Sequence, residues 1–109
     1  MITEAQSQAV VQRIVEGYAP DQIILLGSYA YGTPTEHSDL ALLIIKHHAE
    51  VKRAERSNAV RQLMWGADAP AMDIIIRTPK EMAVRTALYY TIEAQAVEKG
   101  RILYASAHA

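Results

Sequence analysis

The sequence predicts an α/β domain of two layers, in which helices pack on a small mixed sheet of three to four strands. Short runs of β-branched residues and leucine alternate along the chain with longer amphipathic segments. The link between the first two apolar runs is short, which favours a mixed sheet over a purely parallel one. We expect residues 1–109 to form a single domain, because the chain can bury one hydrophobic core but not two.

The first half of the chain predicts two helices and two strands in alternation. Thr3 and Gln6 have the spacing of a capping box and mark the first helix start. The apolar run from Leu40 to Ile45 is unbroken, so we expect a central strand that is covered on both faces. The expected elements are a helix over 3–17, a strand over 23–26, a one-turn helix over 29–31 and a strand over 39–45.

The second half predicts two longer helices, each followed by a strand. Thr78, Pro79 and Glu81 form the sharpest helix start in the chain, with a threonine cap, proline in the first position and glutamate in the third. Tyr89 and Tyr90 fall inside the last helix, where we expect core and rim positions; exposed tyrosines would suit a protein interface. The expected elements are a helix over 49–65, a strand over 72–77, a helix over 78–99 and a short edge strand over 101–104.

Composition excludes several classes of function. The net charge is −1, so we expect no direct contact with nucleic acid or with an anionic membrane surface. Cysteine is absent, which rules out disulfides, thiolate metal sites and a cysteine nucleophile. No apolar run approaches the ~18 residues that span a bilayer, and the first residues lack the pattern of a signal peptide. We therefore expect a cytoplasmic protein.

Gly27-Ser28 follows the first strand and has the chemistry of an anion-binding turn. Glycine lets the backbone approach a ligand closely, and the first amides of a new helix are unpaired donors. The Ser28 hydroxyl adds a further donor. Gly-Ser pairs also occur as plain turns, so the pair alone does not distinguish a phosphate site from a turn.

Asp39 and Asp73 each stand at the start of an apolar strand, where an ionised carboxylate needs a partner if it is buried. Arg77 lies on the same face of its strand as Asp73 and could supply that partner. A magnesium ion is the alternative, since Mg²⁺ favours carboxylates together with phosphate oxygens of a substrate. A phosphate-binding turn beside strand carboxylates indicates metal-assisted phosphoryl or nucleotidyl transfer.

These residues together resemble the signature of the minimal nucleotidyltransferases, a family related to DNA polymerase β. That signature is Gly-Ser, ten residues, Asp, any residue and a second Asp, with a third Asp on a later strand. Here Gly27-Ser28 is followed after ten residues by Asp39, and Asp73 stands where the third Asp is expected. Gly32 and Ser38 also match, and the resemblance covers roughly residues 20–78.

The resemblance implies a nucleotidyltransferase fold and a role for each matching residue. Gly27, Ser28 and Ser38 would contact the phosphates of ATP, and Asp39 and Asp73 would be metal ligands. Asp73 could instead orient the acceptor hydroxyl as a base. In this family the strand carboxylates bind two divalent ions. Residues i and i+2 of a strand point the same way, about 6.5–7 Å apart, so two carboxylates there can share ions about 3.5–4 Å apart.

Ala41 departs from the signature, because the family has its second Asp at this position. A methyl group cannot bind Mg²⁺, so we expect a chain that binds nucleotide but has lost much of its two-metal chemistry. Alanine is the usual choice for removing a side chain, and we favour an engineered replacement over natural loss. Catalysis would then belong to a counterpart with a carboxylate at position 41.

The function implied by the resemblance is protein adenylylation. Relatives that modify antibiotics or nucleic acids carry an extra domain to hold the acceptor, so a bare domain needs a partner. That partner would be an RNase toxin of the HEPN type, whose tyrosine receives AMP while the small chain acts as antitoxin. Two alternatives stay open: a non-catalytic module that neutralises its partner by contact, and a nucleotidyltransferase subunit that modifies a small-molecule antibiotic.

Overall fold

The computed structural model of the chain describes residues 1–50 and 52–107. Within them lies one four-stranded sheet of order β3-β2-β1-β4, in which β2 and β3 are parallel and the other neighbours are antiparallel. The predicted small mixed sheet packed by helices is confirmed, whereas the two layers expected from the sequence become three, because helices cover both faces of the sheet. The elements are α1 (Glu4–Tyr18), β1 (Gln22–Leu26), α2 (Ser28–Tyr31), β2 (Leu40–Ile45), α3 (Arg53–Gln62), β3 (Met72–Arg77), α4 (Pro79–Arg85), α5 (Ile92–Lys99) and β4 (Arg101–Ala105).

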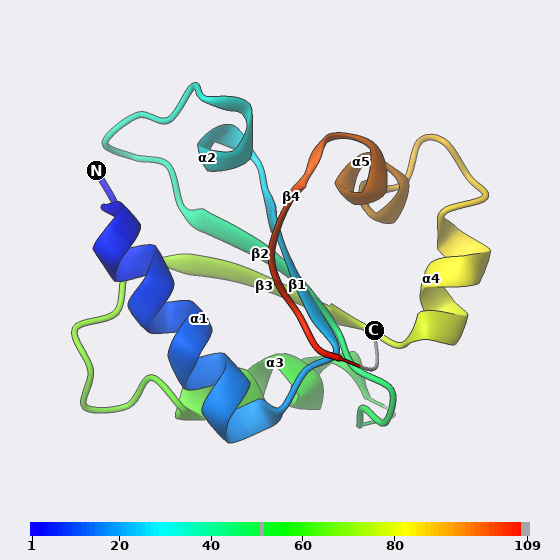
Figure 1. Cartoon of the computed structure of the whole chain (residues 1–109), viewed down its shortest axis with the longest axis horizontal. Helices are drawn as coiled ribbons and strands as arrows, with labels where there is room; N and C mark the ends of the chain where they lie inside the picture. Colours follow the sequence, from blue (N-terminus) through cyan, green and yellow to red (C-terminus); the bar gives the residue numbers. More distant parts are fainter. Residues whose placement is uncertain (51, 108–109) are drawn as a thin grey trace.

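Helices pack on both faces of this sheet, as Figure 1 shows. One face carries α1 and α3, and its core is built on alternate residues of β2, among them Leu42 and Ile44. The other face carries α4 and α5, which pack on Leu43 through Met82 and Ala96. Because β2 is covered on both faces, its apolar run is uninterrupted, as the sequence predicted. No helix in the described ranges is long and apolar enough to cross a membrane.

The predicted helix over 78–99 is wrong, because the structure divides it into α4 and α5. Thr91 ends the connection between them: its hydroxyl donates to the Arg85 carbonyl at 2.8 Å and accepts from the Ala94 N–H at 3.1 Å. Threonine and tyrosine residues between the two helices favour such a break, since threonine hydroxyls compete for backbone groups and both residue types lose rotamer freedom in a helix. Thr91 thereby starts α5.

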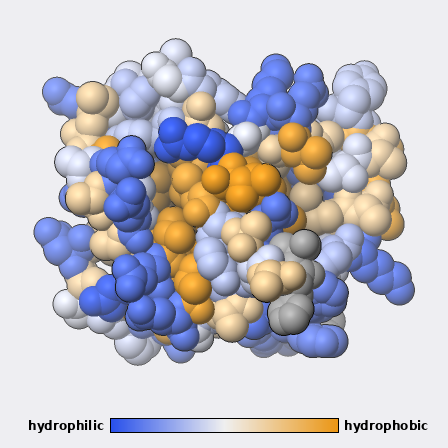
Figure 2. Space-filling view, in the orientation of Figure 1, coloured by the Kyte–Doolittle hydropathy of each residue, from blue (hydrophilic) through white to orange (hydrophobic). Residues whose placement is uncertain are grey.

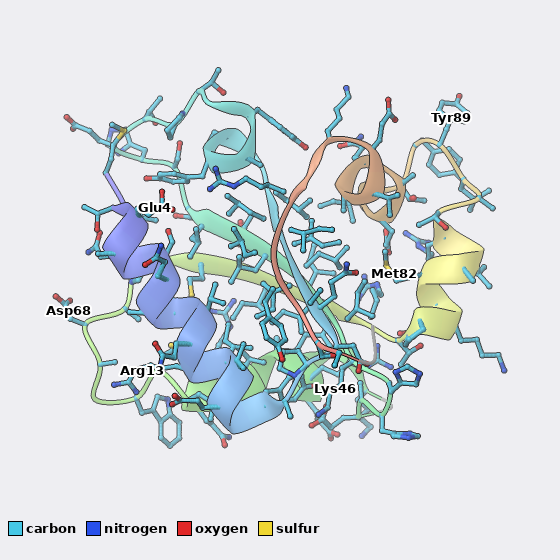
Figure 3. The ribbon with its side chains drawn as sticks, in the orientation of Figure 1. Glu4, Arg13, Lys46, Asp68, Met82 and Tyr89 are labelled. Atoms are coloured by element: carbon cyan, nitrogen blue, oxygen red, sulfur yellow. The ribbon has the colours of Figure 1, made fainter. Side chains whose placement is uncertain are left out.

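The connection between α4 and α5 also contradicts the expected burial of its tyrosines. Tyr89 is 88% exposed and Tyr90 is 67% exposed, and their rings meet edge to face at 5.7 Å. Figure 3 shows Tyr89 projecting outward from this connection, whereas Met82 of α4 points toward the sheet. The predicted helix over 49–65 is shortened to α3, and residue 51, which belongs to that prediction, lies outside the described residues.

An ion pair joins the two helix layers around the end of β3. Arg56 of α3 is buried, and its Nη1 donates to Glu81 of α4 at 2.6 Å and to the Ile76 carbonyl at 3.2 Å. Glu81 also accepts from the Thr78 N–H at 2.9 Å, as the predicted capping box requires. The hydrogen bond from Arg56 is the main reason that the pKa of Glu81 is lowered to about 2.

This pair predicts a loss of stability in acid. A folded-state pKa below the unfolded one stabilises the fold above the unfolded value, and the stabilisation disappears as pH falls through the folded value. We expect the free energy of unfolding to decrease by up to about 2 kcal/mol between pH 4.5 and pH 2, beyond the effect of the other carboxylates. Urea unfolding across this pH range should show a smaller decrease in the free energy of unfolding for Glu81→Gln than for the parent. The same decrease in both proteins would mean that Glu81 is not the group responsible.

Candidate functional site

The residues singled out by the sequence meet at one end of the sheet. Leu26 at the end of β1 pairs with Ala41 of β2, which pairs with Asp73 of β3. Neighbouring strands lie about 4.7–4.9 Å apart, so this row spans about 10 Å from β1 to β3. Gly27 follows Leu26 directly, and Asp39 lies two residues before Ala41. The parallel pairing of β2 and β3 thus brings Asp73 next to a motif that lies more than thirty residues earlier in the chain.

Gly27 forms a turn that only glycine adopts readily. Its φ is 72° and its ψ is −159°, and its carbonyl accepts from the Ala30 N–H at 2.9 Å and the Tyr31 N–H at 3.1 Å. A Cβ at Gly27 would lie 3.6 Å from the Ala41 Cβ, so the turn passes close to β2. Within the described residues no hydrogen bond is recorded for the Ser28 hydroxyl. Ser28 therefore has a donor available for a ligand.

Ser38 lies in the loop that leads from α2 back to β2. Its Oγ accepts from the Thr35 N–H at 2.9 Å, and its own N–H donates to the Thr35 carbonyl at 3.1 Å. These reciprocal bonds close a turn over residues 35–38 directly before Asp39. Ser38 therefore shapes the approach to Asp39, and its contact with a nucleotide stays a prediction.

The two aspartates are exposed, and they lie on the face of the sheet that carries Ala41. Asp73 shares the side of Ala41 through the register. Asp39 lies directly before the first residue of β2, so its side follows from continuing the alternation of side chains by one residue. Exposure explains how each carboxylate begins an apolar strand without a desolvation penalty. Neither aspartate has an ion pair among the residues that the structure describes.

Arg77 is not the partner of Asp73, which corrects one reading of the sequence. Four residues along a strand separate the two by about 13 Å. Arg77 instead donates from Nε to Glu93 of α5 at 3.0 Å, and Arg85 donates to the same Oε2 at 3.1 Å. The sequence pattern did not indicate Glu93, which is fully buried, because its two arginine partners come from two other elements, β3 and α4. Although burial favours the neutral acid, hydrogen bonds from its own backbone N–H and from the two arginines lower the pKa of Glu93.

Ala41 stands between the Gly-Ser turn and Asp73. Its methyl group is half-buried and packs against the apolar cluster under α4 and α5. No group of three or more His, Cys, Asp or Glu side chains in the described ranges could hold a metal ion. The side chains present therefore do not fit a centre of two metal ions. Asp39 and Asp73 suit at most one Mg²⁺, which would keep several waters and take phosphate oxygens from a substrate.

Comparison with solved structures relates this chain to a candidate nucleotidyltransferase from Sulfolobus solfataricus. The two share 16% sequence identity at a TM-score of 0.63, over 93% of this chain and 78% of the other. No protein-family model matches the sequence, and neither does any curated protein. At this identity the likeness establishes the fold alone. The chain has the fold of a nucleotidyltransferase, as its Gly-Ser motif led us to expect.

Proposed function

We propose that this chain binds ATP at the end of the sheet where β1 ends and β2 and β3 begin. One observation carries the proposal: Gly27-Ser28, Asp39, position 41 and Asp73 converge there from three strands. The fold shared with a candidate nucleotidyltransferase supports it. Ser28 and the backbone at Gly27 would donate to phosphate oxygens, and the turn closed by Ser38 would border the nucleotide.

Asp39 and Asp73 would hold one Mg²⁺ that accompanies the triphosphate. Such an ion supplies charge neutralisation of the phosphates and needs only one or two protein carboxylates. With Ala41 between them, these two residues lack the third carboxylate of the family signature. The chain as it stands is therefore proposed to bind nucleotide while being impaired in transfer.

The reaction proposed for a chain with a carboxylate at position 41 is adenylylation of a protein tyrosine. The phenol oxygen attacks the α-phosphorus of ATP and forms a new P–O bond. The bond between that phosphorus and the oxygen bridging to the β-phosphate breaks, and pyrophosphate leaves. The phenol proton passes to Asp73 or to water. The acceptor would be a HEPN-type RNase toxin in the cytoplasm, with this chain as its antitoxin.

An exposed apolar surface supports the idea of a protein partner. Leu88, Tyr89, Tyr90 and Ile92 lie between α4 and the first turn of α5, and each exposes more than a third of its surface. Aromatic residues are enriched in protein interfaces, where their rings bury large areas with little loss of rotamer freedom. This surface is the part of the chain best suited to hold the partner.

A non-catalytic role is the second candidate, and Ala41 is the observation that favours it. A chain that neutralises its partner by contact needs the exposed tyrosines but no complete set of metal ligands. It would bind the partner without ATP and remain inactive when a carboxylate is restored. Modification of a small-molecule antibiotic stays a further alternative.

Replacing Ser28 with alanine should weaken ATP binding by about 10-fold or more, since a hydrogen bond to a charged group contributes roughly 1.5–3 kcal/mol. Isothermal titration with ATP and Mg²⁺ measures this change. Ser57→Ala is the matched control, because the Ser57 hydroxyl bonds to the Ala54 carbonyl on the remote helix α3. A parent chain that binds no ATP, or equal affinities in all three proteins, would overturn the proposed site.

A further inference from the structure

The two edges of the sheet differ in how they are protected. The backbone carbonyls of Ala71 and Arg77 accept hydrogen bonds from β2. Because carbonyls alternate in direction along a strand, those of the even-numbered residues of β3 point away from the sheet. Arg61 donates to the Met72 carbonyl at 3.2 Å, and Arg56 donates to the Ile76 carbonyl at 3.2 Å. Arginine side chains thus occupy this edge. Unprotected edges are templates for further strand pairing, and proteins commonly block them.

The opposite edge, β4, has no such arginine contacts in the described residues, although its register with β1 shifts between Ile23 and Ile24. Within residues 1–50 and 52–107, β4 pairs with β1 alone, and no side chain is recorded as bonding to its backbone. It runs along the near side of the molecule in Figure 1, and Ile102, its second residue, is 59% exposed. The space-filling view in Figure 2 shows a band of hydrophobic surface down the middle of this face, between polar side chains. The edge is therefore both open and apolar.

A hollow of about 830 Å³ lies beside this edge, between β4 and α1. Its walls are apolar at the centre, where Val11 and Val15 of α1 face Leu103 and Tyr104 of β4. A strand added to β4 would lie under this hollow, because the sheet would continue beneath α1. Its side chains on that face would then fill the space.

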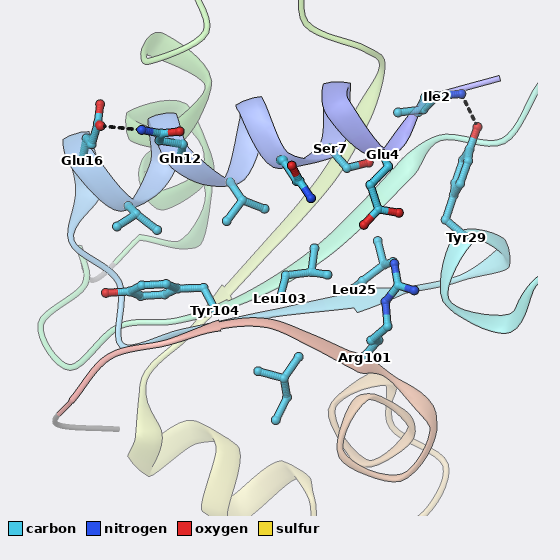
Figure 4. A pocket seen from close by; sticks show the side chains of 14 residues that line it. Ile2, Glu4, Ser7, Gln12, Glu16, Leu25, Tyr29, Arg101, Leu103 and Tyr104 are labelled. Atoms are coloured by element: carbon cyan, nitrogen blue, oxygen red, sulfur yellow. Dashed lines mark hydrogen bonds between the residues drawn. The ribbon is translucent and has the colours of Figure 1, made fainter.

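Charged side chains stand at both ends of the hollow, as Figure 4 shows. Arg101 lies at one end, facing Glu4 of α1, and no ion pair involving Arg101 is recorded among the described residues. Glu16 lies at the other end, above Tyr104, and only its Oε1 is bound, by Gln12 at 3.1 Å. The hollow therefore ends in Arg101 beside Glu4 on one side and in Glu16, with one free carboxylate oxygen, on the other.

We propose that a second copy of this chain occupies the hollow, through antiparallel pairing of β4 with β4 of the other copy about a two-fold axis. Pairing centred on Leu103 places Arg101 of each copy opposite Ala105 of the other. Because β4 and α1 run in the same direction, Arg101 of one copy then reaches the end of the hollow where Glu16 of the other copy lies. The contact is self-complementary, as a two-fold interface requires.

This arrangement pairs the open edge of β4 and fills the hollow beside it. The two sheets join into one of eight strands, so the unpaired backbone groups of both edges bond to each other. Leu103 and Tyr104 of each copy extend the apolar floor under α1 of the other, and two Arg101–Glu16 pairs close the ends. Asp73 lies on β3, at the opposite side of the sheet from β4, whereas Tyr29, next to Ser28, borders the hollow.

The test uses charge reversal at exposed positions. Specific interfaces have a Kd of about 1 μM at the weak end. Sedimentation equilibrium of the parent at about 100 μM should therefore give twice the monomer mass of 12.1 kDa. Arg101→Glu alone and Glu16→Arg alone should each be monomeric, because each homodimer would face like charges. An equimolar mixture of the two variants should be dimeric, since both of its pairs are again opposite in charge.

Glu98→Arg, an exposed position on α5 outside the hollow, is the matched control and should sediment like the parent. Circular dichroism of each variant confirms that the fold is retained. A parent that stays monomeric overturns the proposal. So does a mixture of Arg101→Glu and Glu16→Arg that remains monomeric while the parent dimerises, because the dimer would then use another surface.

Discussion

The Ala41→Asp variant should transfer AMP to a partner protein at a rate about a hundredfold or more above the parent chain. An aspartate at position 41 would lie in register with Asp73 and on the same side of β2 as Asp39. Three carboxylates would then share one end of the sheet, as in the signature of the minimal nucleotidyltransferases that the sequence resembles. Metal ions supply several kcal/mol of transition-state stabilisation, and each ~1.4 kcal/mol is a factor of ten in rate.

The measurement is mass spectrometry of a candidate HEPN RNase after incubation with ATP, Mg²⁺ and each variant, together with release of pyrophosphate. Ala41→Asn is the matched control, because asparagine has the size of aspartate without its charge. Adding Asp73→Asn to the Ala41→Asp chain should abolish the gain. If the partner stays unmodified under saturating ATP, transfer is rejected, and tight association without nucleotide would support neutralisation by contact.

The sequence predicted the strands and the ends of α1 well, because those signals are local. A run such as Leu40–Ile45 is bounded by turn residues, and the capping box at Thr3 lies within four residues of chain. The spacing of Gly27-Ser28 and Asp39 likewise indicated that they lie at the same end of the sheet, since a single turn of helix and one loop separate them. Family resemblance then placed Asp73 beside them, and the β2–β3 register agrees with that placement.

Features that depend on contacts between distant elements were not predicted. The pattern offered Arg77 as a partner for Asp73, because both share a face of one strand, yet helix α5 presents Glu93 to Arg77 instead. Nothing local marks Glu93 as buried. The break before Thr91 is also a tertiary effect in part, because two separate helices let Met82 and Ala96 pack on the same face of the sheet. The exposed tyrosines follow from that break.

The buried carboxylate of Glu93 should make a large contribution to stability, since it accepts hydrogen bonds from Arg77 of β3 and Arg85 of α4. The Arg77 side chain is 13% exposed and the Glu93 side chain is fully buried. Removing one member of such a pair leaves an uncompensated charge, which typically costs about 3–5 kcal/mol. We therefore expect Glu93→Ala to lower the free energy of unfolding by about that amount, or to prevent folding at ordinary temperature.

Urea unfolding followed by circular dichroism measures this loss. The matched control is Glu98→Ala, on the exposed side of the same helix. This control should change the free energy of unfolding by less than about 0.5 kcal/mol. A second variant separates charge from packing. Glu93→Leu combined with Arg77→Met removes both charges and keeps apolar volume, so it should recover most of the loss, because buried ion pairs are often replaceable by hydrophobic residues. If Glu93→Ala lowers the free energy of unfolding by less than about 1 kcal/mol, Arg77 and Arg85 must reach solvent when Glu93 is absent. The two ion pairs would then contribute little to the stability of the fold.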